Sequence, residues 1–470
     1  MQTNHRFPRA AAFLLCAAAA AWSPAGDYPA REGWTSLFDG ATLKGWKAAE
    51  NPQSFTVKDG AIVASGPRAH LFYAGEFEAH DFTNFELAAE IMTNPNSNSG
   101  IYFHTAHQEK GWPAKGIEIQ VNNSFPDPIK TGGLYGLTPP AAPPAKDGAW
   151  FTLRVTVVGK RVVTSVDGAP IAAYTEPTPA PAPAGGFDRR LSRGTFALQA
   201  HDPGSTVRFR RIAVRPLAAL DFPVTDFHVH LKGGLTLAEA LADAEARGLK
   251  FGIAENCGVG FPIAGDAGLD AYLARLAGAP VWKGLQAEGR EWVGLVSPAM
   301  VARFDYVLTD CMTLTDDEGR RMRLWIDDEV HIGDPGKFMD LLVARTAGIL
   351  EREPIDIYAN ATFLPRALAH RYDELWTPAR MDRVIAAAVA NGVAIEINAR
   401  FRVPSIAFIA RAKKAGAKFS FGTNNDGKDL GNLEYSLYAA KAVGLAKDDM
   451  FAPASEGKKP VQRKGLPGTK

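Results

Sequence analysis

The chain has 470 residues and only three cysteines, Cys16, Cys257 and Cys311. Cys16 lies in the apolar stretch at the start of the chain, which leaves Cys257 and Cys311 for the rest. Exported scaffolds that depend on disulfides are much richer in cysteine, so that class is excluded and large hydrophobic cores must supply the stability. A disulfide between Cys257 and Cys311 remains possible if their strands are neighbours.

The chain also lacks an excess of either charge. Its 52 Lys and Arg residues face 51 Asp and Glu residues, for a net charge of +1. Nucleic-acid binders concentrate Lys and Arg on one face, so we expect no nucleic-acid partner. A Gly-rich phosphate loop and a Gly-x-Ser-x-Gly nucleophile elbow are also missing, which removes support for P-loop and α/β-hydrolase chemistry.

The only long apolar stretch stands at the beginning of the chain. Residues 1–25 combine a basic start, an apolar run over 10–22 and the small-residue exit Ser23-Pro24-Ala25, an order typical of a signal peptide. The run is too short to cross a bilayer, which takes about 20 residues. We therefore expect an exported protein, periplasmic or extracellular, without a transmembrane segment; a frayed apolar helix is the alternative.

The first half of the mature chain is predicted to be an antiparallel β protein over residues 31–217. Helical periodicity is almost absent there, and Lys58-Asp59-Gly60 and Val166-Asp167-Gly168 are typical of hairpin tips. Many short strands at this spacing indicate an all-β sandwich of two sheets. The strand-like runs are 54–57, 61–63, 85–91, 117–121 and 151–158.

Several of these strands carry polar side chains at alternate positions. Glu118 and Gln120 share one face of their strand, while Ile117, Ile119 and Val121 share the other. Such a row of hydrogen-bonding groups suits sugar hydroxyls, although an ordinary solvated face has the same pattern. The other members of the row are Asn98, His104, Gln199 and His201.

A series of short blocks in this half resembles the 3-keto-disaccharide hydrolase domain family. Their order and spacing cover nearly all of residues 31–217. The resemblance implies a concanavalin-like jelly roll whose members act on glycosides already oxidised at C3 of the sugar. The blocks are Trp34-Thr35-Ser36-Leu37-Phe38-Asp39-Gly40, Leu43-Lys44-Gly45-Trp46, Asn98-Ser99-Gly100-Ile101, Gly116-Ile117-Glu118-Ile119-Gln120, Gly132-Gly133-Leu134-Tyr135-Gly136 and Gly148-Ala149-Trp150.

The resemblance implies a reaction that needs one good base. A C3 ketone acidifies the C2 proton, so a base can remove it, the enolate can expel the C1 substituent, and water can add to the resulting enone. Glu118 is the expected base or acid, and His104 and His201 are the expected partners that polarise the ketone or bind hydroxyls. His104 stands where the family often has Arg. The expected substrate-binding residues are Asn98, Gln120, Tyr135 and Gln199.

Two alternatives to catalysis stay open for this half. Glu118 could organise loops around the site, and the sandwich could bind a glycan without chemistry. The expected partner is in each case a small molecule or an oligosaccharide, and the sequence predicts no oligomeric state. Hydrolysis and elimination are both compatible with the residues.

After a short proline-containing linker, the periodicity changes to strands alternating with helices. This alternation over residues 221–450 predicts a parallel sheet closed into a distorted (β/α)7 barrel. His228 and His230 lie at the end of the first strand and share one side of it. Residues 451–470, rich in Lys, Gly and Pro, are predicted to be a disordered tail. The predicted strands are 224–229, 251–254, 281–285, 306–309, 355–359, 394–397 and 419–421.

This half is similar to the polymerase and histidinol phosphatase (PHP) superfamily. The superfamily implies several divalent metals and phosphoester hydrolysis, but this chain departs from its ligands. The similarity rests on His228-Val229-His230, Gly284-Leu285-Gln286-Ala287-Glu288, Phe304-Asp305-Tyr306-Val307, Ile355-Asp356-Ile357, Ile395-Glu396-Ile397-Asn398 and Phe421-Gly422-Thr423-Asn424. The departures are Glu255-Asn256-Cys257 for Thr-Asp-His, Gln286 for a bridging Glu, Met312 and Asn360 for two His residues, and Thr423-Asn424-Asn425-Asp426 for Ser-Asp-x-His.

Amide side chains are weak ligands for hard cations, so we expect no trinuclear phosphoesterase. Three alternatives stay open for the barrel. One zinc could be held by His228, His230 and Cys257 with Glu255 or Asp426, which would make a metal-dependent hydrolase acting from the barrel the rival function. A metal-free pocket could use Glu255, Glu288, Glu396 and Asp426. The barrel could also be purely structural.

Overall fold

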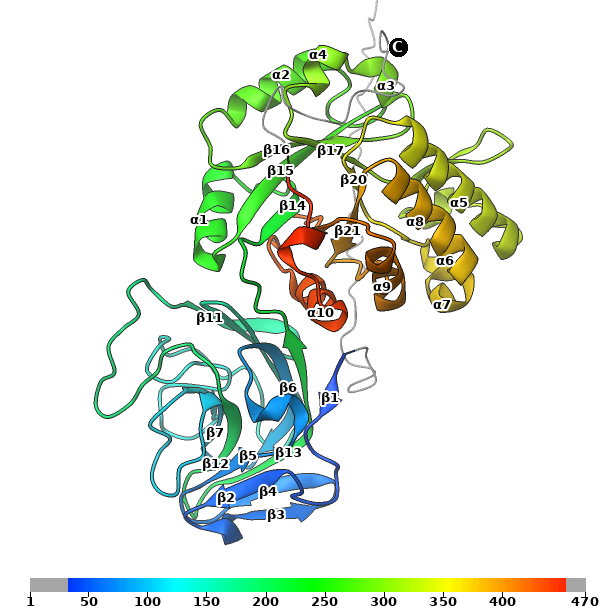
Figure 1. The fold of residues 1–470 in the computed structure, drawn as a ribbon. Coiled ribbons are helices and arrows are strands. Elements are labelled where there is room, and N and C mark those ends of the chain that lie inside the picture. The colour runs from blue at the N-terminus through cyan, green and yellow to red at the C-terminus, as the bar shows by residue number, and fades with distance from the viewer. Residues whose placement is uncertain (1–32, 454–470) are drawn as a thin grey trace, which may run out of the picture.

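The computed structural model describes residues 33–453 and shows two bodies joined end to end (Figure 1). The β-sandwich comes first and the α/β barrel second, as the sequence predicts. The predicted signal peptide and residues 454–470 of the predicted tail lie outside the described residues. None of the helices within 33–453 combines the length and apolar character needed to cross a membrane.

The sandwich consists of two antiparallel sheets. The larger sheet has the order β11-β10-β9-β6-β13-β4-β3, with β1 paired to β13, and the smaller has the order β2-β5-β12-β7-β8. The strands of the larger sheet are β1 Thr35–Ser36, β3 Phe55–Lys58, β4 Ala61–Ser65, β6 Asn84–Thr93, β9 Phe151–Val158, β10 Arg161–Val166, β11 Ala169–Thr175 and β13 Thr206–Leu217. Those of the smaller sheet are β2 Trp46–Ala49, β5 Ala69–Tyr73, β7 Ser99–Thr105, β8 Ile117–Val121 and β12 Thr195–Ala200.

Strand alternation explains the sandwich core. In β9, Phe151, Leu153, Val155 and Val157 are buried while the residues between them are half-buried. In β8, Ile117, Ile119 and Val121 join the same core, so Glu118 and Gln120 must lie on the opposite face of the smaller sheet. The core therefore fixes which face of that sheet carries polar groups.

The barrel is closed by seven parallel strands in the order β14-β15-β16-β17-β20-β21-β22, with helices around it (Figure 1). The strands are β14 Thr225–Val229, β15 Lys250–Cys257, β16 Trp282–Ala287, β17 Tyr306–Thr309, β20 Ile357–Tyr358, β21 Ala394–Asn398 and β22 Phe419–Gly422. The helices are α1 Leu237–Arg247, α2 Asp266–Arg275, α3 Trp292–Leu295, α4 Pro298–Val301, α5 Pro335–Arg352, α6 Arg366–Ala369, α7 Tyr372–Leu375, α8 Pro378–Ala390, α9 Ile406–Lys414 and α10 Glu434–Val443. A hairpin of β18 Thr313–Thr315 and β19 Arg321–Arg323 lies outside the barrel.

Local signals explain where the first helix starts and stops. The Thr236 hydroxyl accepts a hydrogen bond from the backbone N–H of Glu239, whose side chain accepts from the Thr236 N–H in return. The helix ends at Gly248, whose φ of 67° suits a residue without a side chain. The reciprocal cap places α1 directly after the loop that carries His230, at the end of β14.

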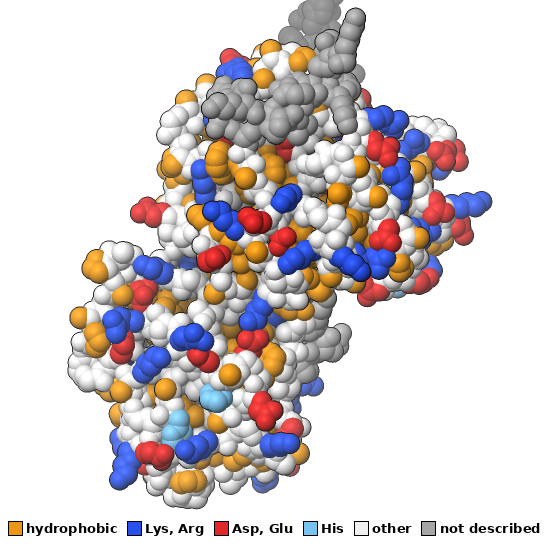
Figure 2. All heavy atoms as spheres, viewed as in Figure 1, with side chains coloured by type: hydrophobic (Ala, Val, Ile, Leu, Met, Phe, Trp, Pro, Cys, Tyr) orange, Lys and Arg blue, Asp and Glu red, His pale blue; other side chains and the backbone are white. Residues whose placement is uncertain are grey.

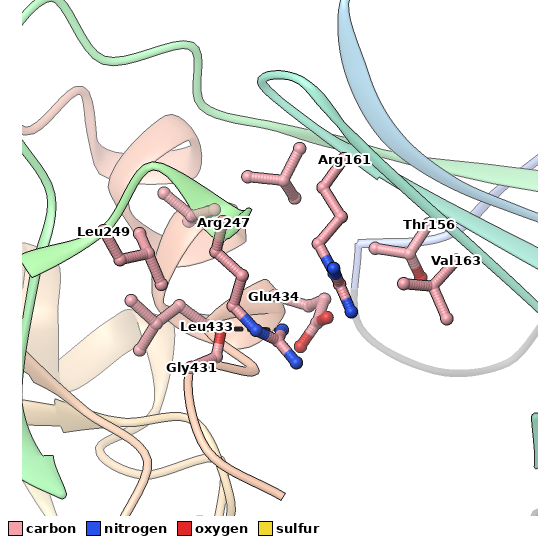
Figure 3. Close-up of a pocket in the computed structure, with 10 residues that line it drawn as sticks. Thr156, Arg161, Val163, Arg247, Leu249, Gly431, Leu433 and Glu434 are labelled. Carbon is pink, nitrogen blue, oxygen red and sulfur yellow. Dashed lines mark hydrogen bonds between the residues drawn. The ribbon is translucent and has the colours of Figure 1, made fainter. Parts of the chain in front are cut away.

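The two bodies meet where α10 of the barrel packs on β13 of the sandwich. A cavity of about 30 Å³ lies in this seam, and Arg161, Arg247 and Glu434 extend toward it (Figure 3). That volume holds one or two waters, so the cavity is a packing defect of the junction and not a substrate site.

The two cysteines of the barrel are free and buried. Cys257 ends β15 and Cys311 follows β17, and β16 separates these two strands in the barrel. The disulfide that the sequence leaves open is therefore not formed, because its condition of neighbouring strands is not met.

Candidate active site

Polar side chains from four neighbouring strands gather on the face of the smaller sheet that points away from the core. Glu118 of β8 lies opposite Tyr102 of β7, and Gln199 of β12 lies opposite His70 of β5. Cross-strand partners have Cβ atoms about 5 Å apart, so these side chains are within reach of one another. Figure 2 shows histidine side chains among interspersed acidic and basic groups on the surface of this body.

Glu118 is the central group of this face. The Tyr102 hydroxyl donates to its Oε2 at 2.7 Å, and the Gln199 Nε2 donates to its Oε1 at 2.7 Å. Burial raises the pKa of Glu118 to about 7, and these two donors act in the opposite direction. A carboxyl group with a pKa near neutrality can accept or donate a proton at pH 7.

The contact between Glu118 and Gln199 spans two strand spacings, because β7 lies between β8 and β12. Gly100 of β7 makes this reach possible. A Cβ at Gly100 would lie 2.9 Å from Glu118 Cγ and closer still to its Oε1. Because Gly100 has no side chain, the Glu118 carboxylate can occupy the space above β7.

We predict that Gly100→Ala lowers kcat/KM about 10–100-fold while the protein stays folded. The new methyl group must push the flexible Glu118 side chain aside, and displacing a reacting group by about 1 Å can cost about 100-fold in rate. Gly294→Ala is the matched control, since a Cβ there meets no atom within 4 Å. Unchanged turnover by Gly100→Ala, at an unchanged melting temperature, would show that the position of Glu118 is unimportant.

A second chain of hydrogen bonds links the predicted sugar-binding residues. Gln120 Nε2 donates to Asn98 Oδ1 at 3.0 Å, and the Asn98 N–H donates to the Ser205 hydroxyl. Ser205 and His201 Nδ1 both bond to the carboxylate of Asp202, at 2.7 and 2.8 Å. The structure thus brings Asn98, Gln120 and His201 into one network on the same sheet as Glu118.

Tyr135 also lies beside the site. Its backbone N–H donates to the carbonyl oxygen of Glu118 at 2.9 Å, so its loop runs along the edge of β8. Burial, together with the charges of Asp127 and Glu118, raises the pKa of its phenol. The half-buried hydroxyl is therefore a neutral group, available as a donor or an acceptor.

The structure does not bring His104 to this site. Its Nδ1 accepts from the Ser192 N–H at 3.1 Å and its Nε2 donates to the Thr83 carbonyl at 2.8 Å. The ring packs against Phe85 and Phe103, which belong to the sandwich core. A φ of 53° at His104 breaks the strand alternation, which explains why the sequence pattern placed it with the polar row.

His70 is a site residue that the sequence analysis missed. It is 2% exposed, and its ring centroid lies 5.4 Å from that of Tyr102 and 5.6 Å from that of Trp112. Its strand reads Ala69-His70-Leu71-Phe72-Tyr73, an almost apolar run. The sequence signal for this role is one polar residue, His70, in an otherwise apolar strand, and such a residue resembles an ordinary buried position of the core.

The mouth of the barrel holds a closed network of hydrogen bonds. His228 Nδ1 lies 2.6 Å from Glu396 Oε1, and its Nε2 lies 2.9 Å from Gln286 Oε1. The Gln286 Nε2 donates to Glu288 Oε1 at 2.9 Å. Both ring nitrogens of His228 are therefore committed to side-chain oxygens, and Glu396 and Gln286 together raise its pKa against the effect of burial.

The predicted zinc ligands are not assembled. Strand alternation turns Asn256 toward Glu288 inside the mouth, so Cys257 and Glu255 point outward, and Cys257 joins the core between strands and helices. Glu255 lies 3.6 Å from Arg275 of α2, and Asp426 is exposed beside Arg400. Over residues 33–453, the structure contains no group of three His, Cys, Asp or Glu residues arranged to hold a metal.

The mouth therefore does not fit a metal ion of the predicted kind. Of the four carboxylates expected in a metal-free pocket, Glu288 and Glu396 lie in the mouth, whereas Glu255 and Asp426 do not. His230 is buried beside His228, with its Nδ1 bonded to the Ala254 carbonyl at 2.9 Å.

Comparison with known proteins finds a family match for the sandwich. Residues 33–215 match the family described as 3-keto-alpha-glucoside-1,2-lyase-like domain. A 3-keto-disaccharide hydrolase of Bacteroides thetaiotaomicron is 33% identical over 79 residues, which cover 15% of this chain. The chain spans only 27% of the length of that relative.

Solved structures resemble each half separately. A putative glycosyl hydrolase from Parabacteroides distasonis is 22% identical with a TM-score of 0.35, covering 40% of this chain and 95% of its own. A histidinol phosphate phosphatase from Lactococcus lactis, solved with zinc, L-histidinol and phosphate, is 14% identical with a TM-score of 0.37, covering 50% of this chain and 98% of its own. Residues 33–215 of this chain are thus similar to the 3-keto-alpha-glucoside-1,2-lyase-like domain family, and a closed α/β barrel follows them.

Proposed function

We propose that this protein cleaves the glycosidic bond of 3-keto-glycosides at the polar face of its sandwich, with Glu118 as the proton-transfer group. The observation that carries the proposal is the Glu118 carboxyl, half-buried, held by Tyr102 and Gln199, and with a pKa of about 7. The match of residues 33–215 to the 3-keto-alpha-glucoside-1,2-lyase-like domain family supports 3-keto-glycosides as the substrate class.

The proposed reaction begins with proton transfer from carbon. Glu118 takes the C2 proton, and the electron pair of the C–H bond moves toward the C3 ketone as an enolate. The enolate then forms the C1–C2 double bond and expels the C1 oxygen, which leaves with the aglycone. In a hydrolytic outcome, water adds at C1 and C2 regains a proton.

Tyr102 and Gln199 have a positioning role in this proposal. Their two hydrogen bonds hold both carboxylate oxygens, so the ionised base is kept in one orientation. Burial offsets the stabilisation that the donors give to the charge, and the balance places the pKa near 7. After it takes the C2 proton, the same carboxyl can return it to the leaving oxygen.

The barrel is the weaker candidate for catalysis. A metal-dependent hydrolase acting from its mouth needs free imidazole nitrogens, and both nitrogens of His228 already bond to side chains. Cys257, the proposed thiolate, lies in the hydrophobic core with a pKa raised by burial to about 11. The signal-like residues 1–25 further lead us to propose an exported enzyme.

The direct test incubates the full-length protein with the methyl α- and β-glycosides of 3-keto-glucose. Mass spectrometry and NMR then identify the products. Release of methanol together with 3-keto-glucose or its 1,2-enone supports the proposal and separates hydrolysis from elimination. Tight binding without product would instead make the sandwich a glycan-binding module.

We predict that kcat/KM rises with pH through a midpoint near 7. The base must be ionised, so the rate should fall about tenfold for each pH unit below the pKa and level off above it. Kinetics between pH 5 and 9, with the melting temperature recorded at each pH, provide the measurement. A midpoint near 4.5, the ordinary value for a Glu side chain, would mean that the working carboxyl is not buried.

A further inference from the structure

On the face of the smaller sheet that carries Glu118, two buried polar atoms have no hydrogen-bond partner among residues 33–453. They are Nε2 of His70 and Oε1 of Gln199. The two residues are 2% and 1% exposed and lie directly opposite each other on β5 and β12. Burying an atom of this kind without a partner costs about 1–3 kcal/mol. Because the two atoms belong to opposite residues on neighbouring strands, one hydrogen-bonding group placed between them would satisfy both.

The chemistry around Gln199 fixes the direction of its oxygen. Its Nε2 donates to the Glu118 carboxylate at 2.7 Å and lies 3.4 Å from the Tyr102 hydroxyl. Turning the amide over would place its oxygen against a carboxylate oxygen, which has no proton to donate when ionised. The oxygen of Gln199 therefore faces away from β7, toward the side on which β5 and His70 lie.

His70 is a neutral imidazole. Burial, with a contribution from the nearby Arg68, lowers its pKa to about 3. A neutral ring has one N–H donor and one nitrogen acceptor, so its Nε2 can pair with a hydroxyl in either role. Gln199 Oε1 accepts only. A group that satisfies both atoms must donate one hydrogen bond, and a hydroxyl can do so while also bonding to the ring.

We propose that His70 and Gln199 form a hydroxyl-binding subsite that orients the sugar beside Glu118. This inference rests on the proposed function and deepens it. The pair accepts a hydroxyl and rejects a ketone, because a carbonyl oxygen cannot donate to Gln199. The oxidised carbon of the substrate therefore lies outside this subsite, and an unmodified hydroxyl of the same ring occupies it.

Trp112 packs against the subsite. Its ring centroid lies 5.6 Å from that of His70 and 5.3 Å from that of His201, and Arg68 stacks over it at 5.2 Å. Trp112 is half-buried, whereas His70 beneath it is almost fully covered. Occupation of the subsite therefore requires the Trp112 side chain to move aside, and the indole is placed to offer an apolar surface to the sugar ring.

The test compares methyl 3-keto-glucoside with its 4-deoxy and 6-deoxy analogues, in wild type and in His70→Phe. Phe keeps a planar ring and removes the polar nitrogen. We expect one deoxy analogue to lose about 10–100-fold in wild-type kcat/KM, because the subsite is then left unpaired. With the parent sugar, the kcat/KM of His70→Phe should be lower than that of wild type by a similar factor. With the affected deoxy analogue, the kcat/KM of His70→Phe should equal that of wild type.

His70→Gln is the second variant, since its amide restores hydrogen-bonding capacity and should recover part of the loss. If His70→Phe lowered kcat/KM by the same factor for all three sugars, His70 would have a purely structural role. No loss on any sugar would mean that an internal water satisfies the two atoms. Either result overturns the subsite.

The subsite can be tested even if wild type cleaves none of the three sugars, which is the failure of the proposed function. Calorimetry of wild type and His70→Phe with the same sugars then measures binding alone. A hydroxyl-dependent difference in Kd between the two proteins supports the subsite. If no such difference in Kd is measured, the subsite proposal is contradicted, whether or not the protein cleaves the sugars.

Discussion

Glu118→Gln should lower kcat by about 10²–10⁴-fold and leave the Kd for 3-keto-glucosides within a few-fold of wild type. Gln has nearly the same shape, and its oxygen can still accept from Gln199 or Tyr102, so the site should stay assembled. It cannot take a proton, and a positioned general base contributes a factor of this size. Steady-state kinetics and calorimetry on the full-length protein measure the two quantities.

Glu90→Gln is the matched control for this variant. Glu90 lies on β6 of the other sheet and pairs with Arg210 and Arg211, so its loss should leave turnover unchanged. If Glu118→Gln kept more than a tenth of the wild-type kcat, the proton-transfer role would have to move to another residue.

Arg215→Met should lower the free energy of unfolding of the sandwich by about 3 kcal/mol. Arg215 and Glu86 are 2% and 3% exposed, and both Nε, at 2.7 Å, and Nη2 of Arg215 donate to Glu86 Oε2. Removing the guanidinium leaves a buried carboxylate with little compensation, which costs about 3–5 kcal/mol. The partly exposed Arg154, 3.7 Å from the other carboxylate oxygen, offsets a small part.

Urea unfolding at pH 7, followed by tryptophan fluorescence, measures this loss. Arg190→Met provides the surface comparison, because Arg190 is exposed and its partner Asp188 is only half-buried, and exposed pairs contribute about 0–1 kcal/mol. The double variant Arg215→Met with Glu86→Leu should recover most of the stability. Equal losses for Arg190→Met and Arg215→Met would show that the buried pair at the junction has no special importance.

The architecture and the polar face of the smaller sheet could be predicted from the sequence. Strand periodicity separated the core-facing Ile117 and Ile119 from Glu118 and Gln120, and the alternation of strands and helices gave a seven-stranded barrel. These predictions succeeded because they depend on local patterns that repeat along the chain. The roles assigned to Glu118, Gln120, Asn98, Tyr135, Gln199 and His201 stay predictions.

Other features depend on contacts between distant strands. Gly100 matters because Glu118 crosses β7 to meet Gln199, and His70 matters because β5 pairs with β12. Neither pairing can be read from one strand alone. His104 was placed with the polar row because its positive φ is invisible to an alternation rule.

The error at Cys257 has a related cause. Cys257 stands where the superfamily has His, and sulfur suits zinc, so it is a predicted ligand beside His228 and His230; successive residues of a strand, however, point to opposite faces. Asn256 takes the inward position and Cys257 the outward one. The mouth is instead filled by amide and carboxylate groups that satisfy one another, as in the link from His228 through Gln286 to Glu288.

The most direct measurement is cleavage of methyl 3-keto-glucoside by the full-length protein in D₂O, with NMR analysis of the released sugar at early times. Proton abstraction next to the ketone predicts methanol release with loss of the original C2 proton: the hydrated product carries deuterium at C2, and the 1,2-enone carries no hydrogen there. This loss should be faster than exchange in a control without enzyme and strongly reduced in Glu118→Gln. Cleavage that retains the original proton at C2, or at an equal rate in Glu118→Gln, would contradict the central claim that this carboxyl breaks the bond through an enolate.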